Sequence, residues 1–117
     1  PQVKGRIRRI QMQMAQKRMM SSVPDADVVI TNPTHYAVAL KYDNKVNSAP
    51  TVIGKGIDFL AIKIKDIAKE NKIPIIENPA LARALYDQID IDREVPNEFY
   101  KAIAEIFSYV YELKRKR

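Results

Sequence analysis

The 117-residue sequence predicts one α/β domain, in which a mixed sheet of four or five strands is flanked by helices. Short runs of β-branched and apolar residues mark the strands, and a stretch with helical apolar spacing separates two of them. The hydrophobic content is 46% with only three glycines, which suits an ordinary buried core. A chain of this length buries roughly two thirds of the surface that its unfolded form exposes.

Residues 1–22 predict a basic helical arm. Met12, Ala15, Met19 and either Ile7 or Ile10 recur about once per helical turn, and basic residues occupy the other faces. A helix with so narrow an apolar stripe is marginal alone, so we expect it to need a partner surface, a neighbouring domain or a membrane interface. Because the chain opens at Pro1 rather than at Met, we expect it to be a piece of a longer protein.

A globular domain is expected at residues 23–113, beginning with two strands at 28–30 and 36–40. Both strands are apolar on each face, as is typical of the centre of a sheet. Polar loop segments at 43–45 and 47–50 lead to a third strand at 51–53. Gly54-Lys55-Gly56 then predicts a turn, because the sequence lacks the longer glycine-bounded loop or third glycine of the phosphate-binding motifs.

A helix at residues 57–70 and a strand at 73–76 follow the predicted turn. Together with strand 51–53 they form a βαβ unit with a right-handed crossover. Pro74 belongs near the start of a strand or at a sheet edge, because proline has no N–H for the ladder.

The remaining chain predicts two helices. A short one lies at 80–86, followed by an acidic connection at 87–94, and the last begins at Pro96-Asn97 and runs into a basic tail at 114–117. The apolar stripe of the last helix consists of Phe99, Ile103, Ile106, Val110 and Leu113.

The net charge of +6 is concentrated at the two ends of the chain. Residues 1–22 carry six basic and no acidic side chains, and residues 114–117 add four basic ones. The part between them holds ten basic and 14 acidic residues, a net charge of −4. A basic nucleic-acid-binding face across the globular domain is therefore not indicated.

Cofactor and metal chemistry finds little support in the composition. The chain has no cysteine and only one histidine, His35, which excludes zinc sites of the Cys/His type and multi-histidine catalytic centres. Nowhere do about 18 apolar residues run together, so no membrane span is predicted. We expect neither a cofactor nor a metal.

Asn32-Pro33-Thr34-His35 is the segment whose covalent chemistry offers a reaction. Ordinary asparagine degradation is closed at Asn32, because Pro33 has no N–H to attack the side chain. The remaining route has the Asn32 side-chain nitrogen attack its own main-chain carbonyl, close a succinimide and expel the Pro33 nitrogen. Such a step needs enforced geometry and donors for the oxyanion, which the Thr34 hydroxyl or turn amides can supply, and His35 can relay the proton.

On the residues alone, a purely structural role for this segment stays open as the alternative. Asn-Pro is a common turn initiator, and a single histidine at the start of a strand is ordinarily structural. Asn78-Pro79 supplies an internal control, because the same dipeptide there is expected only to start a helix with proline at its first position. The chemical hypothesis therefore predicts scission at one of the two Asn-Pro bonds.

Residues 27–42, Asp-Val-Val-Ile-Thr-Asn-Pro-Thr-His-Tyr-Ala-Val-Ala-Leu-Lys-Tyr, resemble the signature of the self-cleaving type III secretion switch proteins. Residues 19–27 and the strand at 36–40 are more similar to the flagellar branch of that family than to the injectisome branch. Further similarity lies at residues 77–86 and from Val95-Pro96 through the last helix. The resemblance therefore extends over nearly the whole chain.

The resemblance implies a cytosolic domain on the cytoplasmic face of the bacterial inner membrane, joined through residues 1–22 to a membrane-spanning half. It implies that Asn32 cyclises, Pro33 leaves, and Thr34 and His35 assist, in a single-turnover self-cleavage whose two fragments stay associated. It further implies a switch of export from rod and hook subunits to filament-type subunits. The implied partners are other membrane components of the export apparatus, the rod and hook substrates and a secreted hook-length ruler.

Two competing hypotheses use the same residues differently. In one, residues 1–22 and 114–117 bind nucleic acid or anionic lipid head groups, and Asn32-Pro33 is only a turn. In the other, the acidic body is a scaffold for partners and the chain never cleaves.

Overall fold

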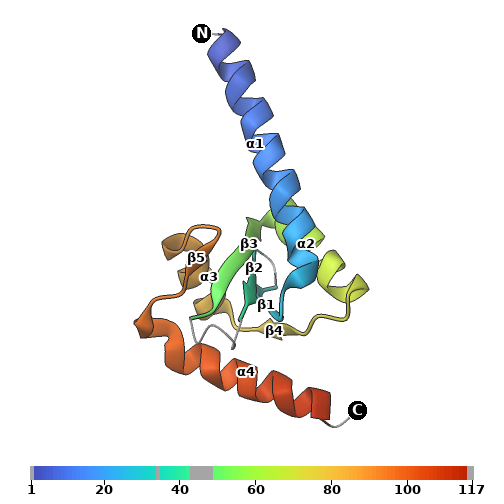
Figure 1. Cartoon of the computed structure of the whole chain (residues 1–117), viewed down its shortest axis with the longest axis vertical. Coiled ribbons are helices and arrows are strands. Elements are labelled where there is room, and N and C mark those ends of the chain that lie inside the picture. The colour runs from blue at the N-terminus through green and yellow to red at the C-terminus, as the bar shows by residue number, and fades with distance from the viewer. Residues whose placement is uncertain (1, 34, 43–48, 116–117) are drawn as a thin grey trace.

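Within the described residues, 2–33, 35–42 and 49–115, the computed structural model contains five strands and four α-helices (Figure 1). In chain order the elements are α1 (Gln2–Ser22), the short 3-10 helix η1 (Val23–Asp25), β1 (Val28–Asn32), β2 (Tyr36–Lys41), β3 (Thr51–Ile57), α2 (Asp58–Glu70), β4 (Ile75–Glu77), α3 (Pro79–Gln88), β5 (Arg93–Glu94), η2 (Asn97–Phe99) and α4 (Tyr100–Arg115).

The sheet has the strand order β4-β1-β2-β3-β5. β1 pairs with β4 in parallel, whereas β1 with β2, β2 with β3 and β3 with β5 are antiparallel. The predicted mixed α/β fold is therefore confirmed. The connection from β3 through α2 to β4 joins two strands that run in the same direction, but β1 and β2 lie between them.

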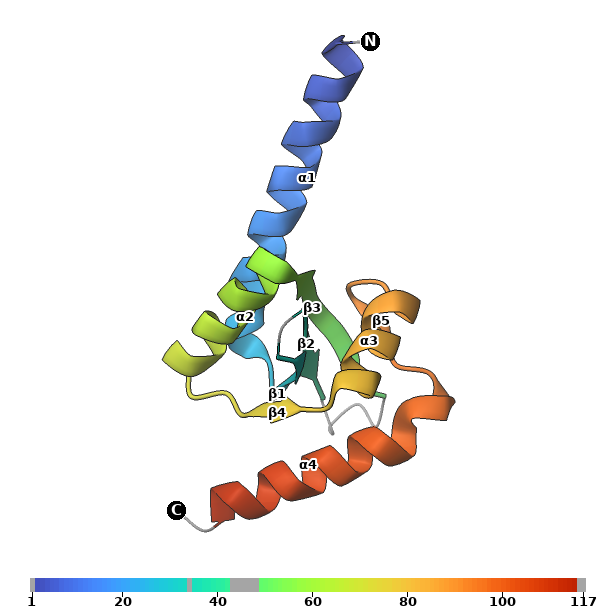
Figure 2. The ribbon, with the colours of Figure 1, turned by 180° about the vertical axis from the view of Figure 1, so that it is seen from behind.

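Helices cover both faces of the sheet, because alternate residues of the central strands point to opposite sides (Figures 1 and 2). Val28 and Ile30 pack with α3 and α4, while Val29 packs with α2 and the end of α1. On the first face the buried helix residues are Leu81, Ala82, Leu85, Ile103, Ile106 and Val110. On the second face they are Met19, Ala61, Ile64 and Ala68.

The turn predicted at Gly54-Lys55-Gly56 is wrong, because these residues continue strand β3. Because side chains alternate along a strand, Gly54 and Gly56 face one side of the sheet and Lys55 faces the other. A Cβ at Gly54 would lie 2.9 Å from the Val23 side chain, and a Cβ at Gly56 would lie 2.6 Å from that of Leu60. Lys55 points to the other face, where its ammonium donates to the Tyr86 carbonyl at 2.8 Å.

Several boundaries differ from the prediction. α3 is longer than expected at both ends, and β5 lies inside the segment that was predicted to be only an acidic connection. Most of the predicted polar loop, residues 43–48, and the last two tail residues lie outside the described part of the chain. Leu113 belongs to the predicted stripe of the last helix but is 42% exposed, since α4 runs past the edge of the core.

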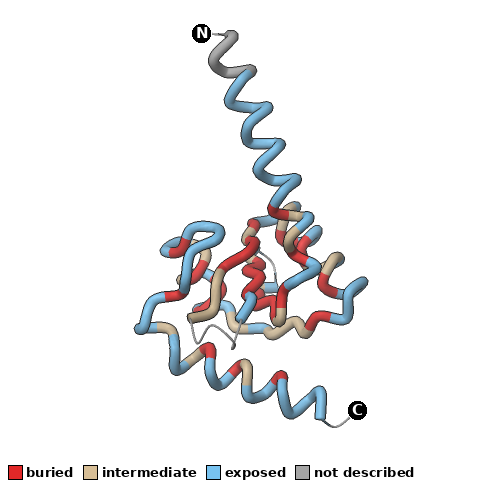
Figure 3. The backbone as a smooth tube through the Cα atoms, in the orientation of Figure 1, coloured by how far each residue is buried: buried red, intermediate tan, exposed pale blue. Residues whose placement is uncertain are grey.

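α1 projects from the rest of the molecule (Figure 1), and the structure with this helix included measures 54 × 29 × 27 Å along its principal axes. Its predicted apolar stripe is mostly solvated: Ile7, Ile10 and Met12 are exposed, and Met19 near the end of the helix is buried (Figure 3). Among the helix side chains whose burial is described, the buried one, Met19, lies near the end of α1, so the helix is anchored near its junction with η1. An exposed helix of this kind agrees with the expectation that it needs a further surface.

Candidate functional site

The Asn32-Pro33 peptide lies where strand β1 ends and the hairpin to β2 begins. Asn32 is half-buried and pairs with Tyr36, the first residue of β2. Pro33 and His35 are exposed, and Thr34 lies outside the described residues. The His35 backbone N–H donates to the Asn32 carbonyl oxygen at 3.1 Å. The hairpin thus brings a donor onto the carbonyl that the predicted cyclisation attacks.

Contacts with neighbouring elements hold Thr31, the residue before Asn32, and Tyr36, the partner of Asn32 on β2. Thr31 is only 3% exposed, and its carbonyl accepts a hydrogen bond from the Asn78 N–H at 2.9 Å. On the β2 side, the Tyr36 ring lies 5.2 Å from the Tyr86 ring of α3. Asn32 is thus paired with β2 and follows a residue that is paired on both sides, which limits its freedom, the condition that a poor nucleophile needs.

Helix α2 contacts the hairpin at two points. Near its start, the Asp58 N–H donates to the His35 carbonyl at 2.9 Å, and the Asp58 carboxylate lies 3.4 Å from His35 Nδ1. Further along, the Lys65 ammonium donates to the Pro33 carbonyl at 3.1 Å. The two helix residues therefore engage the residues on either side of Thr34.

Asp58 sits at an unusual junction. β3 passes into α2 with no intervening loop, and the chain turns there because Asp58 adopts a φ of +48°. This left-handed region is uncommon for residues other than glycine, although aspartate tolerates it better than most. Ile57 pairs with Tyr36 at the end of β3, so the turn places Asp58 beside the hairpin.

Asp58 and Lys65 were missed by the sequence analysis. They lie 23 positions after His35 and 32 after Pro33, on a helix that the sequence predicted only as the link between two strands. Their charged side chains fall among other acids and lysines on that helix, and no motif distinguishes them. Only the placement of α2 across the sheet brings them to the hairpin.

The second Asn-Pro pair takes the predicted structural role. Asn78 is the N-cap of α3, its side-chain oxygen accepts from the Leu81 N–H at 3.2 Å, and proline follows at the first helical position. Such a cap satisfies one of the helix's unpaired N–H groups. The prediction that Asn78-Pro79 is a helix start is therefore confirmed.

Comparison with known proteins identifies the family. The model of the FlhB HrpN YscU SpaS family matches residues 1–110. The chain belongs to this family. It is 56% identical over 116 residues to the flagellar biosynthetic protein FlhB of Bacillus subtilis (strain 168), which covers 99% of this chain and 32% of that protein. It is also 50% identical over 117 residues to FlhB of Salmonella typhimurium, and this match covers 100% of this chain and 30% of that protein.

This chain therefore spans about a third of the length of these relatives. Among solved structures, the cytoplasmic domain of FlhB from Shewanella putrefaciens is similar with a TM-score of 0.82 at 46% identity, covering 86% of this chain and 78% of that one. A mutated EscU C-terminal domain has a TM-score of 0.75 at 29% identity, covering 79% and 92%. EscU domains were solved with substitutions at an asparagine and at the proline that follows it.

The predicted family and its flagellar branch are confirmed by these similarities. No helix among the described residues is long and apolar enough to cross a membrane.

Proposed function

We propose that this chain is the switch domain of a flagellar type III protein-export component, and that it cleaves itself between Asn32 and Pro33. Cleavage permits the export apparatus to change from rod and hook subunits to filament-type subunits. The observation that carries the proposal is the hydrogen bond from the His35 N–H to the Asn32 carbonyl oxygen. That oxygen gains negative charge when the carbonyl is attacked, and a prepositioned donor stabilises the charge.

The reaction needs no reactant other than the chain itself and one water molecule. A bond forms between the Asn32 side-chain nitrogen and the Asn32 carbonyl carbon, and the bond from that carbon to the Pro33 nitrogen breaks. The proton lost by the amide nitrogen is transferred to Pro33, which leaves as a secondary amine. Water then opens the succinimide on the new C-terminus.

The exposure of the loop supports the later steps. Pro33 and His35 are exposed, so water reaches the succinimide and the departing amine can move away. We assign Thr34 and His35 assisting roles, with the His35 amide as the main-chain donor. The reaction is a single turnover of the chain on itself.

We place the domain on the cytoplasmic face of the inner membrane, which is supported by its similarity to the cytoplasmic domain of FlhB from Shewanella putrefaciens. Residues 1–22 then connect the globular domain, 23–113, to a membrane-spanning half, and 114–117 form a basic tail. The exposure of α1 agrees with a connector that another part of the assembly covers. We propose other export-apparatus components, rod and hook substrates and a secreted length ruler as partners.

Export in living cells tests the switch. Full-length protein carrying Asn32→Ala should continue to export rod and hook subunits but should fail to export filament-type subunits. Asn78→Ser is the matched control, because it removes the other Asn-Pro pair and keeps a helix-capping side chain. Normal filament export by the Asn32→Ala cells would contradict the proposal.

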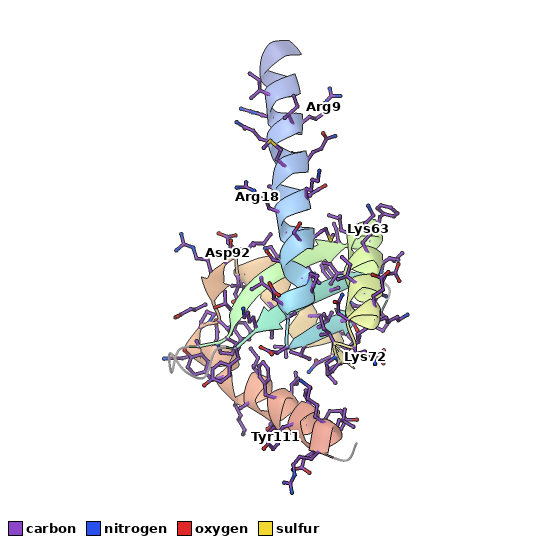
Figure 4. All side chains as sticks on the ribbon, turned by 45° about the vertical axis from the view of Figure 1, so that its right-hand side comes forward. Arg9, Arg18, Lys63, Lys72, Asp92 and Tyr111 are labelled. Atoms are coloured by element: carbon purple, nitrogen blue, oxygen red, sulfur yellow. The ribbon has the colours of Figure 1, made fainter. Side chains whose placement is uncertain are left out.

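One observation favours the competing hypothesis of a basic binding arm. Arg8, Arg9, Lys17 and Arg18 are exposed on the projecting helix, and Figure 4 shows Arg9 and Arg18 extending from it. Under that hypothesis, binding to nucleic acid or anionic vesicles falls steeply with salt and is unchanged in Asn32→Ala. The export proposal predicts instead that the loss of cleavage alone changes what the cell exports.

A further inference from the structure

Helix α2 reaches the cleavage hairpin from outside the Asn-Pro-Thr-His motif. The contacts come from two residues seven positions apart, so they lie on the same side of the helix, two turns from each other. We infer that Asp58 and Lys65 are positioning residues for the cleavage, Asp58 acting through His35 and Lys65 acting on Pro33. This inference rests on the proposed self-cleavage and names the parts of the fold that set its rate.

Asp58 holds His35 by two different atoms. Its N–H donates to the His35 carbonyl at 2.9 Å, and its carboxylate lies 3.4 Å from the ring nitrogen Nδ1. The first contact fixes the main chain of His35, whose own N–H donates to the Asn32 carbonyl at 3.1 Å. The second fixes the orientation of the ring, because a carboxylate at Nδ1 favours the tautomer with its proton there. Asp58 therefore steadies both the oxyanion donor and the imidazole.

Lys65 acts on Pro33, the leaving side of the Asn32-Pro33 bond. Its ammonium donates to the carbonyl of Pro33, the residue whose nitrogen departs, at 3.1 Å. Lys65 is half-buried, so its side chain is already restricted before the contact forms. Holding Pro33 fixes the plane of the leaving group relative to the attacked carbonyl, which is a requirement of reaction geometry.

The backbone of Asp58 gives a second indication. Its φ of +48° is costly for a residue with a side chain, and glycine would adopt it freely. Left-handed residues other than glycine cluster at functional sites. Aspartate at this junction is explained if its carboxylate contributes to the hairpin.

The size of the effect follows from exposure. The side chains of His35 and Asp58 are 63% and 71% exposed, so water screens their interaction. Removal of either α2 contact should slow cleavage about fivefold, the change expected when an exposed charged contact is lost. Neither substitution should abolish the reaction, because Asn32, Pro33 and the His35 amide remain.

The test measures cleavage kinetics of the 117-residue chain. Cell-free synthesis with a short labelling pulse, followed by a chase, gives the fraction of chains cut at each time on a denaturing gel. We expect Asp58→Ala and Lys65→Met to slow cleavage about fivefold. Asp58→Asn and Lys65→Arg keep an acceptor and a donor, respectively, and should stay within about twofold of the wild-type rate.

Matched controls come from the same helix. Lys63 extends away from the body in Figure 4, with its ammonium 4.8 Å from the Phe59 ring centre, and Asp66 is exposed. Lys63→Met and Asp66→Ala should cleave at the wild-type rate. Equal slowing in these controls would overturn the inference, because it would make the effect a general loss of charge on α2.

A double-mutant cycle distinguishes positioning from a structural effect. If Asp58 side-chain action passes through the His35 ring, Asp58→Ala should cause no further slowing in a His35→Ala chain. The slowing caused by Lys65→Met should multiply with the slowing caused by His35→Ala, because Lys65 acts on Pro33 and not through the His35 ring. The same fivefold loss from Asp58→Ala with and without the ring would overturn the role assigned to Asp58, and an unchanged rate in Lys65→Met would overturn that of Lys65.

Asp58→Gly separates cleavage from stability. Glycine suits the left-handed backbone, so the melting temperature of Asn32→Ala chains should not fall when Asp58→Gly is added. In a cleavable chain the same substitution should slow scission as Asp58→Ala does. If the wild type is not cut at all, both the proposed function and this inference fail; if it is cut and the α2 variants match it, this inference alone fails.

Discussion

At the scale of single residues, the two Asn-Pro pairs show how context decides chemistry. The Asn78 side chain is engaged as a helix cap, and the proline after it begins α3. Asn32 ends a strand, and its carbonyl accepts from the N–H of His35. The same dipeptide is therefore expected to be inert at one position and reactive at the other.

Pro33→Ala tests the role of the leaving residue. Alanine restores a backbone N–H after Asn32, so attack on the side-chain carbonyl competes with attack on the main-chain carbonyl. We expect slower scission and a population of whole chains in which the Asn32 amide has become an acid, detected by intact mass. Scission at the wild-type rate with no acid product would contradict the role of proline.

The hypothesis of a reaction at Asn32 could be formed from the sequence because it depends on adjacent residues. Asn, Pro and His stand within one turn, and the missing N–H of Pro33 is a covalent property. Asp58 and Lys65 were not predictable, since they meet the hairpin only through the tertiary placement of α2. The sequence predicted the Thr34 hydroxyl or turn amides as donors to the Asn32 carbonyl, and the structure shows that the amide of His35 takes this position.

At the scale of elements, the junction between β3 and α2 positions the hairpin contacts. The sequence predicted a turn at Gly54-Lys55-Gly56 from glycine content, whereas the turn occurs at Asp58. Glycine was misread because two different requirements, a flexible backbone and the absence of a Cβ, select the same residue. The two-residue spacing of the glycines, which places both on one face of a strand, was the available signal.

Gly56→Ala tests the packing at this junction. The new Cβ would lie 2.6 Å from the Leu60 Cβ and 3.1 Å from the Leu60 backbone, so the start of α2 must shift. Overpacking of this kind costs about 1–3 kcal/mol of unfolding free energy. Urea unfolding of Gly56→Ala in an Asn32→Ala chain measures the loss, and Gly5→Ala on the projecting helix is the control. Equal stability of the two chains would contradict the packing described for Gly56.

At the scale of the whole molecule, the proposed cleavage would divide the chain inside a sheet. Residues 1–32 contribute β1, which lies between β2 and β4 of the other fragment. Val28, Val29 and Ile30 on that strand are fully buried, and Val23 before it is as well. Each such side chain contributes about 1.5–3 kcal/mol by burial, so we expect the two fragments to hold together after the proposed cut.

The fragments should therefore remain one particle after cleavage. We expect residues 1–32 and 33–117 to elute together in size-exclusion chromatography and to separate only when the sheet unfolds in denaturant. Ile30→Ala is expected to weaken the association, because it leaves a cavity in the core. Separate elution of the two wild-type fragments under native conditions would contradict the central position of β1.

Intact mass under denaturing conditions tests the central claim most directly. Freshly synthesised wild type, Asn32→Ala and Asn78→Ser would be sampled over time at neutral pH without added protease. The account predicts that wild type and Asn78→Ser yield fragments 1–32 and 33–117, while Asn32→Ala stays whole. A wild-type chain that remains intact although folded, or an Asn32→Ala chain cut at the same bond, would contradict self-cleavage by cyclisation of Asn32.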